Sequence, residues 1–215
     1  MRKSSIAVLL NLLFCIVSSA SGRPRIGLGY VMGLNSSNMK WEWLDDLLEA
    51  HGSDLKPRNT LCFGAVLDFV LPKGFSVRSE PMFVSKGTNF KGYYGRNDFW
   101  IKTNYIEIPV LLMYRFGARF LQPYILAGPS LGIVLEAGTN DDDIGYCKEA
   151  IKSTDLSGSI GAGLNLATGP LVFFIEGRYS HGYSDLPKEG GADINNMFRQ
   201  VLCGFLFRLN GNEKL

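Results

Sequence analysis

Eight segments of alternating apolar and polar residues, joined by connections that alternate between long and short, constrain the fold of this chain most. The short connections are Pro72–Gly74, Gly117–Phe120 and Ala167–Gly169. The long ones run approximately over 35–59, 87–101, 137–152 and 181–195. In an up-and-down barrel every second connection lies at the same end, so one rim carries tight turns and the other carries large loops. The pattern predicts an eight-stranded antiparallel up-and-down β-barrel.

The start of the chain has the pattern of an export signal. Basic residues precede an apolar stretch, 6–17, that is too short to span a bilayer, and small residues follow it. We expect a signal peptide at 1–22, cleaved after Ala20 or Gly22, and a single barrel domain at 23–215. No stretch of the mature sequence is long and apolar enough for a transmembrane helix, so insertion into a membrane requires strands.

Composition excludes several classes of function. The formal net charge of the chain is +2, which argues against a dedicated nucleic-acid surface. Cys62, Cys147 and Cys203 lack the spacing of a metal site and allow at most one disulfide. The acidic run at 141–143 lacks the alternating ligands of a calcium loop, and we interpret it as solvated loop charge. We expect no metal and no cofactor.

The two faces of the predicted strands differ in a way that decides what surrounds the barrel. In the segment 155–166 the polar face consists mostly of serine and glycine. Short polar residues suit a crowded, hydrogen-bonded lumen, whereas the exterior of a secreted soluble carrier would show lysine, glutamate and threonine. We therefore expect a transmembrane barrel in the bacterial outer membrane, with its apolar face toward lipid.

Charged residues of both signs share the inward face of these strands. Buried charges need partners, so this mixture predicts a lumen filled by ion pairs, with a ligand or proton site as the alternative. The candidates for this ion-pair core are Arg78, Glu80, Glu107, Arg115, Glu176 and Arg178. Glycines at 128, 132, 161 and 163 are expected to leave room for their long side chains.

Aromatic residues crowd the ends of the strands that meet the tight turns. They are Phe69, Phe75, Tyr114, Phe116, Phe120, Phe173, Phe205 and Phe207. Such a cluster is typical of the aromatic girdle at one membrane interface. Together with the alternation of long and short connections, it predicts that the tight turns and both chain termini face the periplasm and that the long loops lie outside the cell. In the first long loop, apolar residues at helical spacing over 39–50, between Asn38 and Gly52, predict an amphipathic helix.

Several stretches resemble one family of barrels. They are Tyr105–Leu112, Pro123–Gly132, Glu176–Tyr179, Ser85–Gly87 and Gly161–Leu164. Together they are similar to the PorT-like outer-membrane beta-barrel family of Gram-negative bacteria. The resemblance covers nearly the whole mature chain and implies an eight-stranded barrel in the outer membrane. It also implies an association with protein export, which is known for the name-giving member, although most relatives have no assigned activity.

Catalytic chemistry has one candidate position, His181, which is followed by Ser184 and Asp185. A hydrolytic triad is assembled in space, and three near neighbours on a strand end do not provide it. We expect a non-enzymatic protein that acts as a structural, binding or export-associated component through its loops. An outer-membrane lipid-modifying or hydrolytic enzyme with a site near His181 is the alternative. The expected partners are outer-membrane lipids, lipopolysaccharide and other envelope or export proteins, and no nucleic acid.

Overall fold

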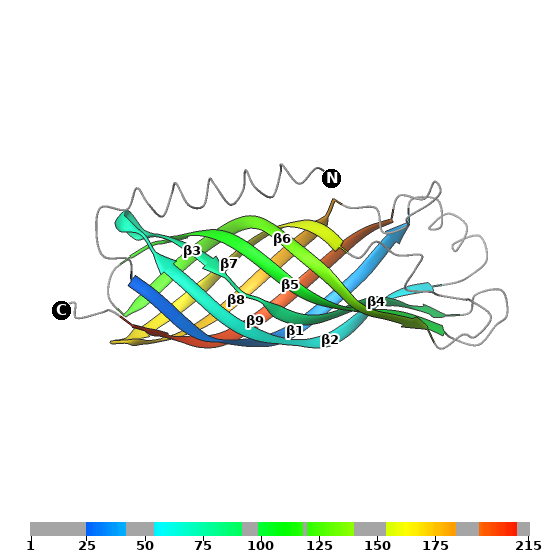
Figure 1. The fold of residues 1–215 in the computed structure, drawn as a ribbon, viewed down its shortest axis with the longest axis horizontal. Helices are drawn as coiled ribbons and strands as arrows, with labels where there is room; N and C mark the ends of the chain where they lie inside the picture. The colour runs from blue at the N-terminus through cyan, green and yellow to red at the C-terminus, as the bar shows by residue number, and fades with distance from the viewer. Residues whose placement is uncertain are drawn as a thin grey trace.

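A computed structural model describes residues 25–41, 54–91, 99–117, 120–139, 154–183 and 194–209. In these residues one antiparallel sheet curls into an elongated barrel (Figure 1). Its strands are β1 (Arg25–Trp41), β2 (Asp54–Val70), β3 (Phe75–Ser79), β4 (Met82–Lys91), β5 (Phe99–Arg115), β6 (Leu121–Thr139), β7 (Thr154–Thr168), β8 (Leu171–Gly182) and β9 (Ile194–Arg208). The sheet closes because β1 pairs with both β2 and β9. The predicted signal peptide lies outside the described residues.

β3 and β4 occupy a single position in the wall, because both pair with β2 on one side and with β5 on the other. The barrel is therefore eight-stranded, as predicted. The sequence predicts one uninterrupted strand over 75–86, whereas the structure interrupts it at Glu80 and Pro81. Proline has no backbone N–H to give to the ladder. The Pro81 carbonyl still accepts a hydrogen bond of 3.1 Å from the Ala65 amide.

Pro109 and Pro129 cannot donate ladder hydrogen bonds, so the sequence predicts a bulge or a local break in pairing at each of them. Pairing between β5 and β6 is interrupted between Pro109–Ser130 and Leu112–Ala127, and the register is the same on both sides. The local break in pairing is therefore present without a bulge. The register shift between these strands lies at Asn104 and Tyr105.

The strands run farther toward the long connections than the sequence predicts. The β1–β2 ladder continues to Ser37–Arg58, beyond the predicted strand end at Met32. Asn38, the predicted helix cap, lies inside β1, so a helix beginning there is wrong. Most of the predicted helix lies outside the described residues. The sequence did not predict this extension, because the residues concerned do not alternate between apolar and polar. A strand that continues above the membrane needs no apolar residue at every second position. No helix among the described residues is long and apolar enough to cross a membrane.

The heights of the walls differ around the rim. At about 3.3 Å per residue and a tilt of about 40°, β5 rises roughly 40 Å from Arg115 to Phe99. By the same estimate β8 rises only about 25 Å from Leu171 to His181, close to the height of the apolar band of an outer-membrane barrel. The ends of β2, β4, β5 and β6 thus form a tall wall, and β7 and β8 form a low one (Figure 1).

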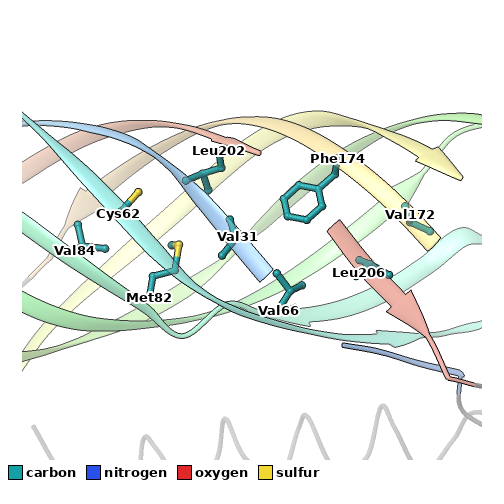
Figure 2. Packing of buried hydrophobic residues seen from close by; sticks show 9 residues of the cluster. All are labelled: Val31, Cys62, Val66, Met82, Val84, Val172, Phe174, Leu202 and Leu206. Atoms are coloured by element: carbon teal, nitrogen blue, oxygen red, sulfur yellow. The ribbon is translucent and has the colours of Figure 1, made fainter. Parts of the chain in front are cut away.

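The alternation of faces is confirmed. Large apolar side chains project outward, including Leu34, Leu61, Leu112, Ile125, Ile160, Ile175 and Val201. The lumen contains an apolar layer that the sequence reasoning missed (Figure 2). It consists of Val31, Cys62, Val66, Met82, Val84, Val172, Phe174, Leu202 and Leu206. These residues occupy inward positions of the alternation, so the lumen contains packed apolar side chains as well as charged side chains.

The tight turns use backbone conformations that favour glycine. Thr168 pairs directly with Leu171, so β7 and β8 are joined by a two-residue loop. Gly169 is its first residue and has φ 73°. The turn therefore lies two residues later than the predicted start at Ala167. Aromatic rings pack beside the turns on the outer face, with centroid distances of 4.8 Å for Phe75–Tyr114. This arrangement fits the predicted girdle.

Candidate functional site in the lumen

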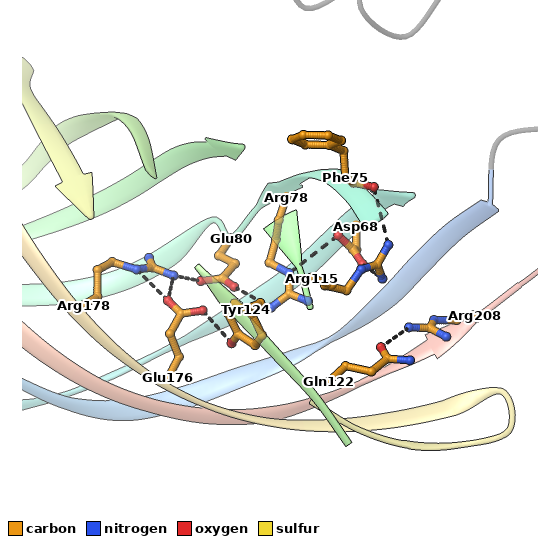
Figure 3. A network of polar contacts seen from close by, with 10 residues as sticks. All are labelled: Asp68, Phe75, Arg78, Glu80, Arg115, Gln122, Tyr124, Glu176, Arg178 and Arg208. Atoms are coloured by element: carbon orange, nitrogen blue, oxygen red, sulfur yellow. Dashed lines mark hydrogen bonds and ion pairs between the residues drawn. The ribbon is translucent and has the colours of Figure 1, made fainter. Parts of the chain in front are cut away.

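A chain of buried charges crosses the lumen, and its centre is Glu80 at the break between β3 and β4 (Figure 3). Arg178 of β8 donates to Glu80 Oε2 at 2.5 Å from Nη2. The same guanidinium donates to Glu176, with its Nε 2.8 Å from Oε1. Glu176 and Arg178 are two residues apart on one strand, so alternation sends both side chains inward.

Arg78 of β3 extends the chain of charges toward the tight turns. Its Nη1 lies 3.7 Å from Glu80 Oε1, and its Nε lies 3.7 Å from Asp68 Oδ1. Its guanidinium carbon also lies 5.0 Å from the ring centroid of Phe174, within the range of a cation–π contact. Arg115 Nη1 then lies 4.0 Å from Asp68 Oδ2. The carboxylate of Asp68 is thus shared by two arginines.

Tyr124 of β6 joins the network, because its hydroxyl donates to Glu176 Oε2 at 2.9 Å. We call the resulting group the plug. It consists of Asp68, Arg78, Glu80, Arg115, Tyr124, Glu176 and Arg178. Its three guanidinium groups face three carboxylates, and its ion-paired side chains are at most 9 % exposed. Such a buried network with balanced charge fits a structural role that obstructs the lumen.

One of the four predicted glycines makes room for the plug directly. A Cβ atom at Gly163 would lie 2.4 Å from Tyr124 Cζ and from its hydroxyl oxygen. Only a residue without a side chain lets the Tyr124 ring lie against β7 at this position. The glycine and the tyrosine are direct cross-strand partners, so their identities depend on each other.

A second charged group lies nearer the long connections. Lys86 Nζ lies 3.5 Å from Glu107 Oε2, and Ser130 donates to Glu107 Oε1 at 2.9 Å. The ammonium also lies 3.8 Å from the ring centroid of Phe198 and 4.9 Å from that of Tyr105. We call Lys86 and Glu107 the upper pair.

The six candidates from the sequence thus divide between two groups. Arg78, Glu80, Arg115, Glu176 and Arg178 belong to the plug, whereas Glu107 belongs to the upper pair. Sequence reasoning did not select Asp68, Lys86 or Tyr124. All three occupy inward positions of their strands, so the alternation itself carried the signal that would have found them.

Neutral polar side chains line the lumen between the plug and the loop end. We call them the collar: Asn35, Ser37, Ser159, Ser180 and Gln200, all buried. Ser159 and Ser180 share a hydrogen bond of 2.7 Å across the β7–β8 ladder. Ser37 and Asn35 donate to the Gly87 and Ser85 carbonyls at 3.0 Å and 3.2 Å.

The candidate catalytic position does not face the lumen. His181 lies on β8 at an outward position, next to Tyr183, with ring centroids 5.7 Å apart. Ser184 and Asp185 lie outside the described residues, as does the acidic run at 141–143. In the described ranges no cluster of three histidine, cysteine or acidic residues could hold a metal ion. Cys62 is buried and Cys203 is exposed, and both are free thiols.

A family model for the outer membrane protein beta-barrel domain matches residues 19–187. The chain belongs to this family. The match agrees with the closed barrel and its apolar exterior, and it places the protein in the bacterial outer membrane. It does not distinguish a PorT-like branch within the family. A comparison with curated proteins finds no match for this chain.

Solved structures with the same fold are also outer-membrane barrels. The outer membrane protein OprG from Pseudomonas aeruginosa matches with a TM-score of 0.55 at 14% identity, over 87% of this chain and 96% of that one. Neisserial surface protein A matches with a TM-score of 0.46 at 12% identity, over 85% and 97%. Ail of Yersinia pestis matches with a TM-score of 0.44 at 15% identity, over 85% and 99%. At such identities the likeness concerns the fold alone.

Proposed function

We propose that this protein is a closed, non-enzymatic outer-membrane barrel that serves as a structural and binding component through its extracellular end. The observation that supports this most is the plug. An eight-stranded barrel has an interior just wide enough to be filled by side chains. Here the filling includes charges that hold one another across the lumen, from β2 and β3 to β6 and β8. General diffusion of solutes is therefore not its task.

The tall wall supports the second part of the proposal. The β5–β6 ladder continues to Ile101–Thr139, and the β4–β5 ladder to Phe90–Phe99. These strand ends stand roughly 15 Å above the apolar band of the membrane, given the heights estimated for β5 and β8. An extended sheet held above the membrane is a surface for partners. Its proposed partners are lipopolysaccharide and other envelope proteins.

The finer proposal is a PorT-like association with protein export. It draws on the resemblance of Tyr105–Leu112 and Pro123–Gly132 to that family. These segments form the β5–β6 wall, so the resemblance falls on the strands that rise farthest. An enzymatic role near His181 has no comparable support, because the side chain of this residue lies at an outward position.

Two measurements test the proposal together. In planar bilayers the purified barrel should show no steady conductance of porin size. On intact cells, chemical crosslinking should capture envelope partners, and replacing 92–98 and 140–153 by short Gly-Asn turns should abolish this capture. A variant with a tag in the Gly117–Phe120 turn, at the opposite end, is the matched control and should keep it. Each variant must retain heat-modifiable migration, which reports the folded barrel.

A steady open conductance would overturn the claim of a closed barrel. Capture that survives replacement of the loops but is lost in the turn-end control would place the binding surface at the periplasmic end and contradict the second part. For the export role, secretion of exported proteins should fall when the gene is deleted. Unchanged secretion would remove that finer proposal and leave the rest intact.

A further inference from the structure

The outer wall of the barrel is hollowed across β6, β7 and β8. Pro129, Gly158 and His181 form one cross-strand row over these three strands. All three positions face outward, and the middle one has no side chain. The row therefore has two raised ends and a depression between them. A groove of about 430 Å³ occupies this place, a size within the range of small-ligand sites.

Neighbouring rows bound the groove along the barrel axis. On the side of the tight turns, Ile160 of β7 and Tyr179 of β8 form its apolar floor. On the side of the loops, the Tyr183 amide donates to the Leu156 carbonyl at 2.8 Å, which holds this residue beside β7. Its ring lies over Gly158, because a Cβ there would be 2.6 Å from the Tyr183 hydroxyl. The glycine thus makes room for the Tyr183 ring, which forms part of the groove lining.

The level of the groove within the membrane indicates which kind of ligand fits it. His181 lies ten residues beyond Leu171, roughly 25 Å along the barrel axis, so it stands where the apolar band of the outer leaflet ends. Ile160 and Tyr179 lie below this level, within the leaflet. The imidazole of His181 and the hydroxyl of Tyr183 lie at the upper edge, where lipid headgroups begin. A ligand with an apolar chain below and an anionic group above matches this order.

We propose that the groove binds one acyl chain of a phosphate-bearing glycolipid of the outer leaflet, of the lipid A type, with a phosphate held by His181 and Tyr183. The chain lies beside the Tyr183 ring, between Pro129 and His181 and against Ile160. Both polar groups at the rim can donate hydrogen bonds to phosphate oxygens. The face is turned to the membrane, which supplies this lipid at high local concentration. This site deepens the proposed function, which names lipopolysaccharide as a partner. It is separate from the lumen and from the tall wall, so its failure would leave the closed barrel and the binding of envelope proteins intact.

Retention of lipid by the folded barrel tests the site. The protein is placed in nanodiscs that contain lipid A, phosphatidylglycerol or an uncharged diacyl glycolipid, and the lipids that remain bound are counted by native mass spectrometry. One lipid A molecule should remain on the wild-type protein, with phosphatidylglycerol and the uncharged glycolipid retained less. Gly158→Leu displaces the Tyr183 ring, which disrupts the groove and moves one phosphate donor, and it should lower lipid A occupancy about tenfold, the equivalent of about two buried methylene groups.

Gly177→Leu is the matched control. Gly177 also faces outward, on β8, but a Cβ there meets nothing within 4 Å, so the new side chain enters open lipid. Its lipid A occupancy should equal that of the wild type. His181→Phe keeps an aromatic ring and removes the donor, so it should abolish the preference for lipid A over the uncharged glycolipid. If Gly158→Leu loses heat-modifiable migration, Gly158→Ala, which displaces the Tyr183 ring, takes its place.

Three results would overturn the proposal. Equal retention of all three lipids would mean annular lipid only. Equal loss in the Gly158 and Gly177 variants would mean that the groove has no special role. A dimer in lipid-free detergent that Gly158→Leu dissociates would mean that a second copy of the chain, rather than a lipid, covers this face.

Discussion

The plug and the collar occupy the same lumen and use opposite means to fill it. In the plug, Glu80 and Asp68 each contact two arginines, so the loss of one side chain affects several others. In the collar, Ser159 bonds to Ser180, and Ser37 bonds to a backbone carbonyl, so each contact is local. The plug therefore behaves as one unit, whereas the collar is a set of independent bonds.

This difference matches the position of each group along the barrel axis. On β8, the strand that both groups share, the collar residue lies closer to the loop end, because Ser180 follows Arg178. Toward the extracellular rim, neutral hydroxyl and amide groups can exchange protein partners for water at little cost. Deeper in the lumen, unpaired charges would be costly, so complete pairing is required there. Closure of the barrel thus depends on the plug.

The largest effect is expected from Arg178→Met. The substitution keeps most of the side-chain volume but leaves Glu176 without its guanidinium partner and Glu80 with Arg78 alone. Removing one partner of a buried pair costs about 3–5 kcal/mol. The free energy of unfolding, measured by urea titration of tryptophan fluorescence in lipid vesicles, should fall by this amount. The midpoint of heat-modifiable migration should fall with it.

A double variant separates charge balance from packing. Arg178→Met combined with Glu176→Gln leaves two arginines facing two carboxylates in the plug. It should recover a substantial part of the lost stability, because no carboxylate is then without a guanidinium partner. If the double variant is as unstable as the sum of the two single variants, the plug does not act as one unit, and the contrast with the collar fails.

The sequence indicated most of this arrangement, and the exceptions have identifiable causes. Alternation of faces places a residue inside or outside, so Arg78 and Glu176 were found as lumen residues from their positions alone. Alternation does not show which inward side chains contact one another, because partners such as Glu80 and Arg178 are far apart in the chain and meet across the lumen. Glu107 was consequently grouped with the plug, although it pairs with Lys86.

The heights of the walls above the membrane also could not be predicted from the sequence. Within the membrane, lipid requires an apolar residue at every second position, and this periodicity marks the strands clearly. Above the membrane, Asn35–Trp41 continues β1 by backbone pairing, and polar residues such as Asn35 and Ser37 support that pairing equally well. The position of the groove could not be predicted either, because Gly158 lies beside Pro129 and His181 only in the folded sheet.

A smaller effect is expected from Gly163→Ala. The added methyl group would lie 2.4 Å from the Tyr124 ring, which must move and lengthen its hydrogen bond to Glu176. Overpacking of this kind costs about 1–3 kcal/mol. Gly138→Ala, near the loop end of β6, is the matched control, because a Cβ there meets nothing within 4 Å. The same urea titration should show a loss for the first variant and almost none for the second. Equal losses would mean that glycine acts through strand propensity and not through the plug.

The smallest effect is expected in the collar, from Ser180→Ala. The substitution removes one hydroxyl from the 2.7 Å contact with Ser159 and leaves the other hydroxyl in a lumen lined by further polar groups. A neutral hydrogen bond contributes about 0.5–1.5 kcal/mol, and access to water from the loop end should keep the loss near the lower limit. Ser159→Ala and the double variant should give nearly the same loss as the single one, since all three remove the same bond. A loss comparable to that of Arg178→Met would show that the collar is as tightly coupled as the plug, and that closure extends along the whole lumen.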